Sequence, residues 1–456
     1  MNTKTGEFEF TDDQKNCLTF LSTSHGWVSV IGQAGVGKST VIIEYIKICL
    51  SKGLSVVCTA PTNKATRVLS EMASCAGITV DCITTYSLLG LVLTSAGEVR
   101  EIRQKGSTDS YDILIIDECS MVGEKLWTYL QKNGGNFGKI VFMGDSAQLP
   151  PVKEGLSPSF SLLNKFTLTK IVRQHADNPI ISLCSSIRKS IFTGTPYVFK
   201  KELQENSKDG VYCYNGIERF EKQILRAYEK LWDKGPNEVR VLAWTNRQVD
   251  YYNSMIRKHL IGETETPFIV GEYVVTKSPV NVLKGLLAHY NILEAKVEMS
   301  PVLSTDSIAK VVGIHKTMHP FYVSLKIPVY AIELIPFTKT DLDISISDTE
   351  SKNSVTAYFP ADNCAKNIAI ELAASAKKNP KLWEKFWLFS DSVNDDIAPC
   401  YSNTIHRSQG STYSSVVFVN AVDINYISDP KERHRCMYVG VSRSAKKVVI
   451  LGEAKS

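Results

Sequence analysis

The first third of the chain alternates short, wholly apolar runs with longer amphipathic stretches. The apolar runs are expected to be buried strands, and the stretches that follow them have the spacing of helices. The strands are expected at 27–31, 54–58, 113–116 and 139–143, and the helices at 38–50 and from about 63. Strands that are apolar on both faces, with helices between them, are typical of a parallel sheet covered on both sides. The pattern therefore predicts a doubly wound α/β unit.

The same alternation returns later in the chain, with a long interruption. Strands are expected at 239–244, 416–419 and 448–451, and helices at 247–260 and 435–441. Between about 276 and 399 the alternation stops, and short β-type runs such as 321–325 and 329–332 predict a small barrel or sheet. A shorter insertion at 91–105 has the pattern of a β-hairpin, with its turn at 94–97. The chain is thus expected to contain two α/β units, each with an insertion.

Composition restricts the class of protein. The chain has 456 residues, of which 43% are hydrophobic and 22% are charged, a globular balance that argues against a mainly disordered protein. No apolar run approaches the roughly 18 residues that a membrane span needs, and the first residues lack the apolar stretch of a secretory leader. Eleven cysteines occur without a zinc-type pair, which predicts reduced thiols in a cytosolic protein. The net charge of +5 permits a nucleic-acid partner without requiring one.

A phosphate-binding loop is the most specific signal in the sequence. Residues 32–39 match G-x-x-x-x-G-K-[ST], directly after an expected strand and at the start of an expected helix. In this context the loop N–H groups surround phosphate, Lys38 reaches the β- and γ-phosphates, and the Ser39 hydroxyl binds Mg²⁺. The alternative is a plain glycine-rich turn. The predicted nucleotide-binding residues of this segment are Gly32, Gly35, Val36, Gly37, Lys38, Ser39 and Thr40.

Two further polar segments follow expected strands. Asp117 and Glu118 follow the strand at 113–116, at the edge where ligands bind in open α/β sheets. Asp117 is predicted to hold Mg²⁺ and Glu118 to act as general base; the alternative is an aspartate that caps the next helix. Gln148, after the following strand, is predicted to sense the γ-phosphate or to position water, although its segment also suits a turn. Residues 63–66 do not complete a guanine-reading N-K-x-D motif.

Taken in order, these motifs resemble those of superfamily one helicases of class B, the RecD-like group. The segments that carry the resemblance are 11–14, 32–39, 60–65, 117–120, 144–152, 168–174, 243–246, 404–411 and 438–443. The resemblance implies two RecA-like P-loop domains with parallel sheets, a small β-hairpin insertion in the first and a mainly β, SH3-like insertion in the second. The implied bounds are 1–190 for the first domain with its hairpin at 88–110, 191–275 with 400–456 for the second domain, and 276–399 for the inserted domain.

The resemblance also implies roles that spacing alone does not define. Gln14 corresponds to a glutamine that reads adenine, which implies ATP as the nucleotide. Arg173 and Arg443 correspond to two arginines that reach the γ-phosphate across an interdomain cleft, as arginine fingers. Gln409 is implied to face the same phosphate and to join that site to the DNA contacts. For each arginine the alternative is a solvated surface charge.

A path for single-stranded DNA is expected at the ends of strands in both halves of the chain. A translocase grips the sugar–phosphate backbone because it must move over any sequence. The predicted contacts are Pro61, Thr62, Asn63, Lys64, Thr84, Thr85, Tyr86, Thr245, Asn246, Thr404, His406 and Ser408. The alternatives are caps and turns for the threonines and asparagines, and a buried core position for His406. Tyr86 stands where the family usually has histidine, and the hairpin at 91–105 resembles the pin that splits the duplex.

The motifs and the resemblance together predict a Mg²⁺- and ATP-dependent DNA helicase that moves along single-stranded DNA. The resemblance alone implies 5′→3′ movement, unwinding of forked DNA in phage replication or recombination, and a setting in the host cytoplasm. We expect a monomer without a membrane partner, and a single-strand-binding protein or other replication proteins as further partners. Two alternatives stay open: an RNA-directed helicase, and an ATP-driven nucleic-acid-binding switch without unwinding. An aromatic helical stripe at 382–389 is expected to pack against protein rather than DNA.

Overall fold

The structure is a computed structural model. The residues that it describes are 10–93, 99–101, 110–151, 154–171, 178–199, 201–203, 208–284, 298–320, 322, 325–337 and 354–452. The chain divides into two compact units. The first unit comprises Met1–Ile224, Val239–Val249 and Asn403–Ser456, and the second unit comprises Leu225–Glu238 and Asp250–Ser402.

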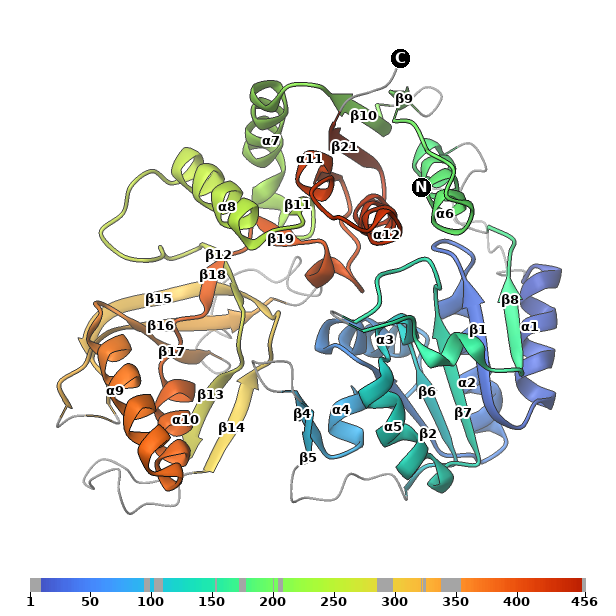
Figure 1. Cartoon of the computed structure of the whole chain (residues 1–456), viewed down its shortest axis with the longest axis horizontal. Helices are drawn as coiled ribbons and strands as arrows, with labels where there is room; N and C mark the ends of the chain where they lie inside the picture. Colours follow the sequence, from blue (N-terminus) through green and yellow to red (C-terminus); the bar gives the residue numbers. More distant parts are fainter. Residues whose placement is uncertain are drawn as a thin grey trace. The chain divides into compact units, whose positions relative to one another are not determined.

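The first sheet of the first unit has six parallel strands within the described residues, in the order β3-β2-β6-β7-β1-β8 (Figure 1). Its strands are β1 (Gly26–Gly32), β2 (Val56–Ala60), β3 (Asp81–Thr84), β6 (Ile113–Ile116), β7 (Lys139–Gly144) and β8 (Lys165–Leu168). The helices with it are α1 (Asp12–Thr23), α2 (Lys38–Ser51), α3 (Asn63–Cys75), α4 (Thr85–Leu88) and α5 (Glu124–Asn133).

Helices cover both faces of this sheet, which explains its uniformly apolar strands. Successive residues of β2 point to opposite faces, so Val56 and Cys58 pack with residues of α1, α2 and α3, whereas Val57 packs with residues of α4 and α5. All of β2, β6 and β7 is buried as a result. The predicted parallel α/β unit is confirmed, with β1, β7 and β6 as neighbours at its centre.

A second sheet in the first unit has the strand order β19-β11-β20-β21-β10-β9. Its strands are β9 (Glu202–Leu203), β10 (Gly210–Tyr214), β11 (Val239–Ala243), β19 (Ser402–Thr404), β20 (Val416–Asn420) and β21 (Lys447–Leu451). The β11, β20, β21 and β10 strands pair in parallel, as expected for the second α/β unit. Its helices are α6 (Pro179–Thr193), α11 (Ala421–Ile424) and α12 (Pro430–Ser442), and α7 (Ile217–Leu231) and α8 (Asn246–Leu260) continue into the second unit.

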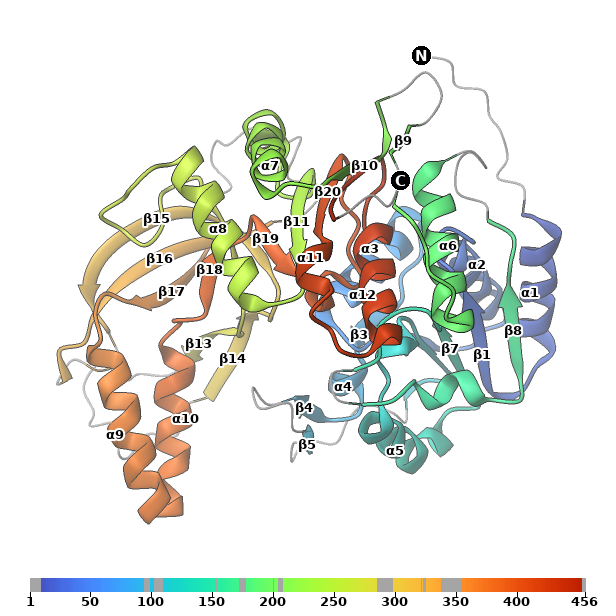
Figure 2. The same cartoon turned by 45° about the horizontal axis from the view of Figure 1, so that its top comes forward.

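Helices α6 and α12 lie side by side and share one core with the second sheet (Figure 2). Ile187 of α6 and Met437 of α12 belong to this core, together with Ala147 and Leu149 from the loop after β7 of the first sheet. That loop therefore packs into the hydrophobic core of the second sheet. The helix α6 extends to Thr193, and the implied domain boundary at 190 stays a prediction.

The predicted hairpin insertion of the first sheet is formed by β4 (Leu91–Leu93) and β5 (Val99–Glu101). The two strands pair antiparallel, with Leu91 opposite Glu101. The turn expected at 94–97 lies outside the described residues. No helix among the described residues has the length and apolar character that crossing a membrane requires.

The second unit contains a five-stranded antiparallel sheet in the order β17-β16-β15-β12-β18. Its strands are β12 (Tyr273–Thr276), β15 (Ile308–Met318), β16 (Pro328–Pro336), β17 (Val355–Pro360) and β18 (Ile397–Pro399). A separate hairpin consists of β13 (Val280–Lys284) and β14 (Glu298–Leu303), and the helices are α9 (Cys364–Lys378) and α10 (Trp383–Ser392). The expectation of a mainly β insertion is confirmed, and the helix α9 is an addition to it.

Two sequence predictions for the inserted region, a β-type run and an aromatic stripe, have different outcomes. The strand expected at 321–325 is wrong in its described part, which belongs to the connection between β15 and β16. There the Leu325 N–H donates to the carbonyl of Tyr322, three residues earlier, at 3.0 Å, which is the bond of a turn and not of a strand. The aromatic stripe lies on α10, where Phe389 is buried in the core of the unit. The rings of Phe386 and Trp387 contact each other at 4.9 Å, while 43% of Trp387 remains exposed.

Candidate active site

The phosphate loop joins β1 to α2 at the carboxyl edge of the first sheet. Gly35 and Gly37 have φ angles of 88° and 80°, in the left-handed region that residues with side chains rarely adopt. A Cβ atom on Gly37 would also lie 2.3 Å from Nε2 of Gln14, and one on Gly32 would lie 2.7 Å from Cγ2 of Val36. The three glycines are therefore required by conformation or by close packing.

Gln14 is held against this loop by a capping box at the start of α1. The Thr11 hydroxyl accepts a hydrogen bond from the Gln14 N–H at 3.3 Å, and Gln14 Oε1 accepts one from the Thr11 N–H at 3.1 Å. Gln14 Nε2 also donates to the carbonyl of Val36 at 3.4 Å. The Gln14 side chain is buried and lines the cavity beside the loop. This position suits a nucleotide contact, and the adenine-reading role stays a prediction.

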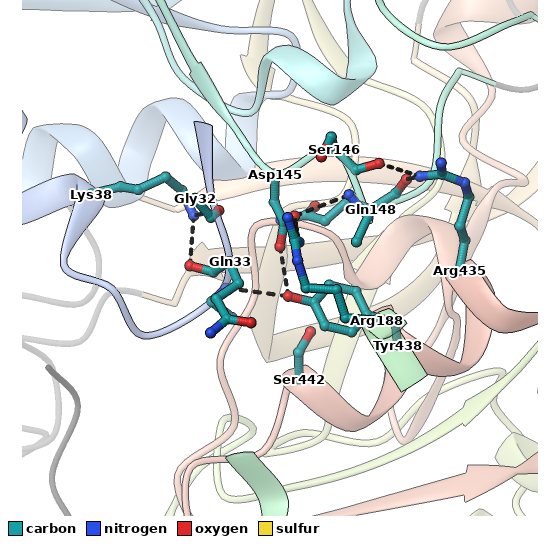
Figure 3. Close-up of polar contacts among 12 residues, drawn as sticks. Gly32, Gln33, Lys38, Asp145, Ser146, Gln148, Arg188, Arg435, Tyr438 and Ser442 are labelled. Carbon is teal, nitrogen blue, oxygen red and sulfur yellow. Dashed lines mark hydrogen bonds and ion pairs between the residues drawn. The ribbon is translucent and has the colours of Figure 1, made fainter. Parts of the chain in front are cut away.

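A cavity of about 550 Å³ lies beside the loop and is lined from both sheets of the first unit. The predicted residues that line it are Gln14, Gly35, Gly37, Lys38, Ser39, Thr40, Asp117, Glu118, Gln148 and Arg443. Lys38 Nζ donates to the carbonyls of Gly32 at 2.7 Å and Gln33 at 3.1 Å (Figure 3). The ammonium group is thus held at the phosphate loop, where it can neutralise phosphate charge.

Asp117 and Glu118 follow β6 at the edge of the cavity. Asp117 Oδ1 accepts the Glu118 N–H at 2.8 Å, and Asp117 N–H donates to the carbonyl of Thr59 at 2.8 Å. Burial, and then the neighbouring charge of Glu118, raise the pKa of Asp117 from 3.8 to about 7, against an opposing effect of Lys38. Glu118 has a φ angle of 49°, and a left-handed residue other than glycine costs about 1–3 kcal/mol, a strain that is common at functional sites.

The donor set at this edge fits Mg²⁺. A hydroxyl and a carboxylate, from Ser39 and Asp117, are hard oxygen ligands that line the same cavity. Mg²⁺ usually takes one or two protein oxygens and completes its shell with phosphate and water. Within the described residues there is no group of three or more His, Cys, Asp or Glu side chains that could hold a metal ion.

Arg443 brings a guanidinium from the second sheet into the cavity. It caps the C-terminus of α12, and only 6% of it is exposed. Its Nε donates to the Val439 carbonyl at 3.1 Å, its Nη1 to the Ser411 carbonyl at 3.2 Å, and its Nη2 to the Ser442 hydroxyl at 2.9 Å. These contacts orient a fixed positive charge, which is the arrangement that an arginine finger requires.

Gln148 and Gln409 meet where the loop after β7 contacts the second sheet. Gln409 Nε2 donates to Gln148 Oε1 at 3.5 Å and to the Leu149 carbonyl at 3.2 Å. Gln148 lines the cavity, whereas Gln409 lies behind it in contact with Gln148. Arg435, for which the sequence predicts no role, donates from Nη1 to the carbonyl of Ser146 and, at 2.8 Å, to that of Gln148 (Figure 3).

A second missed group surrounds Asp145, which follows β7 directly. Its carboxylate is fully buried and forms an ion pair with Arg188 of α6. The Tyr438 hydroxyl donates to Asp145 Oδ2 at 2.6 Å. Asp145 could have been suspected from its place after a buried strand. Arg188 carries no local signal, because its contact joins residues 43 positions apart.

The predicted DNA contacts on the first sheet fall at helix starts. Thr62 is the N-cap of α3 and accepts the Ala65 N–H at 3.3 Å, and Thr84 is the N-cap of α4 and accepts the Ser87 N–H at 3.1 Å. The side-chain exposure of this set differs: Asn63 is exposed, Pro61, Lys64 and Tyr86 are partly exposed, and Thr85 is fully buried. Burial, and then Glu154, raise the pKa of Tyr86.

The predicted contacts on the second sheet are partly occupied by protein. The Thr245 hydroxyl donates to Asp423 Oδ1 at 3.0 Å, and the fully buried Ser408 hydroxyl donates to the Ile405 carbonyl at 2.7 Å. Thr404 Oγ1 accepts the Arg407 N–H at 3.3 Å, and burial lowers the pKa of His406. Asn246, the first residue of α8, is exposed. Contact with DNA stays a prediction for all of them, and Arg173 lies outside the described residues.

Two family models match the chain. One, an AAA domain, matches residues 9–192, and another, a UvrD-like helicase C-terminal domain, matches residues 399–451. The first match includes Lys38 and Asp117, and the second includes Gln409 and Arg443. The two sides of the cavity thus fall within two different matched segments.

The chain is also similar to known proteins. It is 25% identical over 455 residues to the ATP-dependent DNA helicase dda of Enterobacteria phage T4, covering 95% of this chain and 97% of that protein. It is 34% identical over 174 residues to the ATP-dependent RecD2 DNA helicase of Deinococcus radiodurans, covering 38% of this chain and 23% of that protein. Its fold is similar to the Pif1 helicase from Bacteroides in complex with ADP-AlF3 and ssDNA, with a TM-score of 0.51, 16% identity, and coverage of 99% and 94% of the two chains. The predicted resemblance to class B helicases of superfamily one is confirmed.

Proposed function

We propose that this chain is an ATP-dependent DNA helicase that translocates 5′→3′ on single-stranded DNA and unwinds duplex DNA. The cavity of the first unit carries this proposal, because Lys38 and Asp117 line it from the first sheet and Arg443 lines it from the second. A hydrolytic site that needs groups from two sheets is complete only when both are in place, which couples ATP turnover to movement. The similarity to the DNA helicase of phage T4 supports DNA as the polymer.

The residues of the cavity divide the chemistry of phosphoryl transfer among them. Lys38 and Arg443 neutralise the charge that develops on the γ-phosphate, and Glu118 accepts a proton from the attacking water. Ser39 and Asp117 hold Mg²⁺, which supplies charge neutralisation on the phosphates when bound. Gln148 orients the water or the γ-phosphate, and its contact with Gln409 connects that position to the second sheet.

Single-stranded DNA is proposed to run over the helix starts that follow β-strands in both sheets. The exposed amides of Asn63 and Asn246 occupy comparable positions, at the first residues of α3 and α8. Backbone N–H groups at helix starts suit phosphate, and contacts to phosphate do not depend on sequence. One set of contacts on each sheet would let one sheet hold the strand while the other moves.

The biological setting is proposed from similarity. The full-length similarity to a phage helicase supports a role in phage replication or recombination inside the bacterial cytoplasm. Forked DNA, a single-strand-binding protein and other replication proteins are the proposed partners, and the active form is proposed to be a monomer. The adenine-reading role of Gln14 and the second finger role of Arg173 belong to the same proposal.

The deciding experiment measures ATP hydrolysis with and without single-stranded DNA, and unwinding of duplexes with a 5′ or a 3′ tail. We expect DNA-stimulated turnover and unwinding of the 5′-tailed duplex alone. A Lys38→Ala variant serves as the control for a contaminating ATPase. Stimulation without unwinding would indicate a translocase or an ATP-driven switch, and stimulation by RNA alone would indicate an RNA-directed helicase. Unwinding of the 3′-tailed duplex alone would contradict the proposed direction.

A further inference from the structure

The hydroxyl of Tyr438 connects two parts of the first unit that come from opposite ends of the chain. Tyr438 lies on α12, and its hydroxyl oxygen accepts the N–H of Ala34 in the phosphate loop at 3.2 Å. The same hydroxyl donates to Asp145 Oδ2 at 2.6 Å. A hydroxyl has one proton to donate, so the donation to Asp145 leaves its lone pairs for Ala34. Only 1% of Tyr438 is exposed, which limits competition from water.

Asp145 is a rigid partner for this hydroxyl. Its Oδ1 accepts the Ala147 N–H at 3.0 Å and pairs with the Arg188 guanidinium, and its side chain is fully buried. A hydroxyl–carboxylate hydrogen bond of 2.6 Å has the length of a charge-assisted bond, which is about twice as strong as one between neutral groups. Burial, and then the charge of Asp145, raise the pKa of Tyr438, so the hydroxyl keeps the proton that it donates.

A second contact ties α12 to the loop after β7, which contains Asp145. Arg435 lies three residues before Tyr438 on α12 and therefore on the same face of the helix. Its Nη1 donates to the carbonyls of Ser146 and Gln148, which flank Ala147, two residues after Asp145. Arg443 is the residue that follows α12 and lines the cavity. A helix with these two contacts carries the guanidinium of Arg443 at its end.

We propose that Tyr438 is a positioning residue for ATP hydrolysis, whose hydroxyl couples the phosphate loop to α12 and thereby sets the place of Arg443 in the cavity. The proposal rests on the proposed function, because it assigns Arg443 to the reaction. The Ala34 N–H belongs to the loop that surrounds phosphate and lines the cavity, and Asp145 follows β7, the strand next to β1. One hydroxyl thus joins the ends of two neighbouring strands of the first sheet to the helix that carries Arg443.

A Tyr438→Phe variant tests this coupling, because it removes the hydroxyl and keeps the buried ring. Loss of a hydrogen bond to a charged group is worth about 1.5–3 kcal/mol, or about tenfold to a hundredfold in rate if it acts in the transition state. We expect kcat for ATP to fall at least about tenfold, in both basal and DNA-stimulated turnover, while the KM for ATP stays within about threefold.

Tyr228→Phe is the matched control. Tyr228 is also fully buried, and its hydroxyl donates to the backbone carbonyl of Tyr401 in the second unit. It is not among the described residues that line the cavity. The control loses a buried hydroxyl and a hydrogen bond, so its melting temperature reports the structural cost of such a loss, and its kcat should stay within about twofold of the wild type.

A double-mutant cycle identifies Asp145 as the partner. If the hydroxyl acts through Asp145, the Tyr438→Phe and Asp145→Asn changes are not additive, and the double variant turns over ATP about as fast as the slower single variant.

Additive losses of kcat would overturn the coupling, and so would an unchanged kcat in Tyr438→Phe. A fall in kcat that tracks a lowered melting temperature and recovers on cooling would assign Tyr438 a structural role instead. An absence of DNA stimulation in the wild type would contradict the proposed function, while the basal kcat of Tyr438→Phe would still test the inference.

Discussion

The backbone N–H of Tyr413 donates to the carbonyl of Arg443 at 2.9 Å, and this contact holds the Arg443 backbone independently of its side chain. The carbonyl of Tyr413 in turn accepts the N–H of Ala445 at 2.9 Å. A short bridge between two segments of the second sheet region therefore holds the main chain on both sides of Ser444, directly after Arg443. Changes to the guanidinium should leave this backbone in place.

We predict that Arg443→Ala lowers ATP turnover by roughly 10³-fold or more, as the loss of an arginine finger does, while ATP binding stays within about tenfold. The measurement is single-turnover hydrolysis together with the affinity for a fluorescent ATP analogue. Arg443→Lys keeps the charge without the planar fork and should recover only part of the rate. Unchanged turnover in Arg443→Ala would remove the finger role.

Lys38→Ala is expected to abolish ATP turnover and to leave binding of single-stranded DNA intact. The ammonium group is held at the loop by the carbonyls of Gly32 and Gln33, and the predicted contacts with single-stranded DNA use other residues. Hydrolysis and DNA anisotropy on the same preparation check both parts. Near-normal turnover in this variant would show that the phosphate site is wrongly assigned.

Gly37→Ala is expected to prevent ATP binding at concentrations that saturate the wild type. A side chain at this position is strained by the φ angle of 80°. Its Cβ atom would also lie 2.3 Å from Nε2 of Gln14. Gly135→Ala is the control, because a Cβ atom there meets nothing within 4 Å and no positive φ is involved. Equal ATP affinity in the two variants would contradict the close packing between α1 and the loop.

The raised pKa of Asp117 predicts a specific pH dependence of stability. Because the folded-state pKa is raised from 3.8 to about 7, the protonated form favours the folded protein, and this contribution is lost as the pH rises through about 7. Asp117→Asn, which carries no charge, should therefore raise the melting temperature of the nucleotide-free protein at pH 8, and the gain should shrink toward pH 5. The same variant should lose Mg²⁺-dependent turnover at every pH.

Asp112→Asn supplies the opposite sign as a control. Hydrogen bonds from the Ser55 side chain and backbone lower the pKa of Asp112, so its contribution is present above its ordinary pKa and is lost as the pH falls. The asparagine variant at this exposed site should not gain stability at pH 8. A gain of equal size in both variants would mean that the effect does not come from the burial of Asp117.

Exposure separates two of the predicted DNA contacts. Asn63 is exposed at the start of α3, and we expect Asn63→Ala to weaken single-stranded DNA binding about fivefold, the equivalent of one hydrogen bond of about 1 kcal/mol. The buried hydroxyl of Ser408 already donates to the Ile405 carbonyl, so Ser408→Ala should lower stability by about 1 kcal/mol and leave DNA affinity unchanged. DNA anisotropy and thermal melting of both variants test the distinction, and a loss of affinity only in Ser408→Ala would reverse it.

Much of the site could be predicted because its residues lie next to local signals. Lys38, Asp117 and Gln148 each follow a buried strand, and strands buried on both faces are apolar throughout, which the sequence shows directly. It was harder to foresee from the sequence which polar side chains are already bound to protein or buried. Thr245 and Ser408 have the composition of strand-end contacts, but the first is bound to Asp423, 178 residues away, and the second is enclosed in the core.

The sequence by itself determined the two parallel α/β sheets and the phosphate loop, because periodicity and glycine positions act over a few neighbouring residues. It also indicated Arg443, through a motif that stands in one segment. Only the tertiary structure decided what holds that arginine in place. The contacts of Tyr438 with Ala34 and Asp145 span 404 and 293 residues, and their geometry exists only once both sheets have folded against each other. No local pattern encodes such a pairing, because it depends on the packing of α12 against the loop after β7.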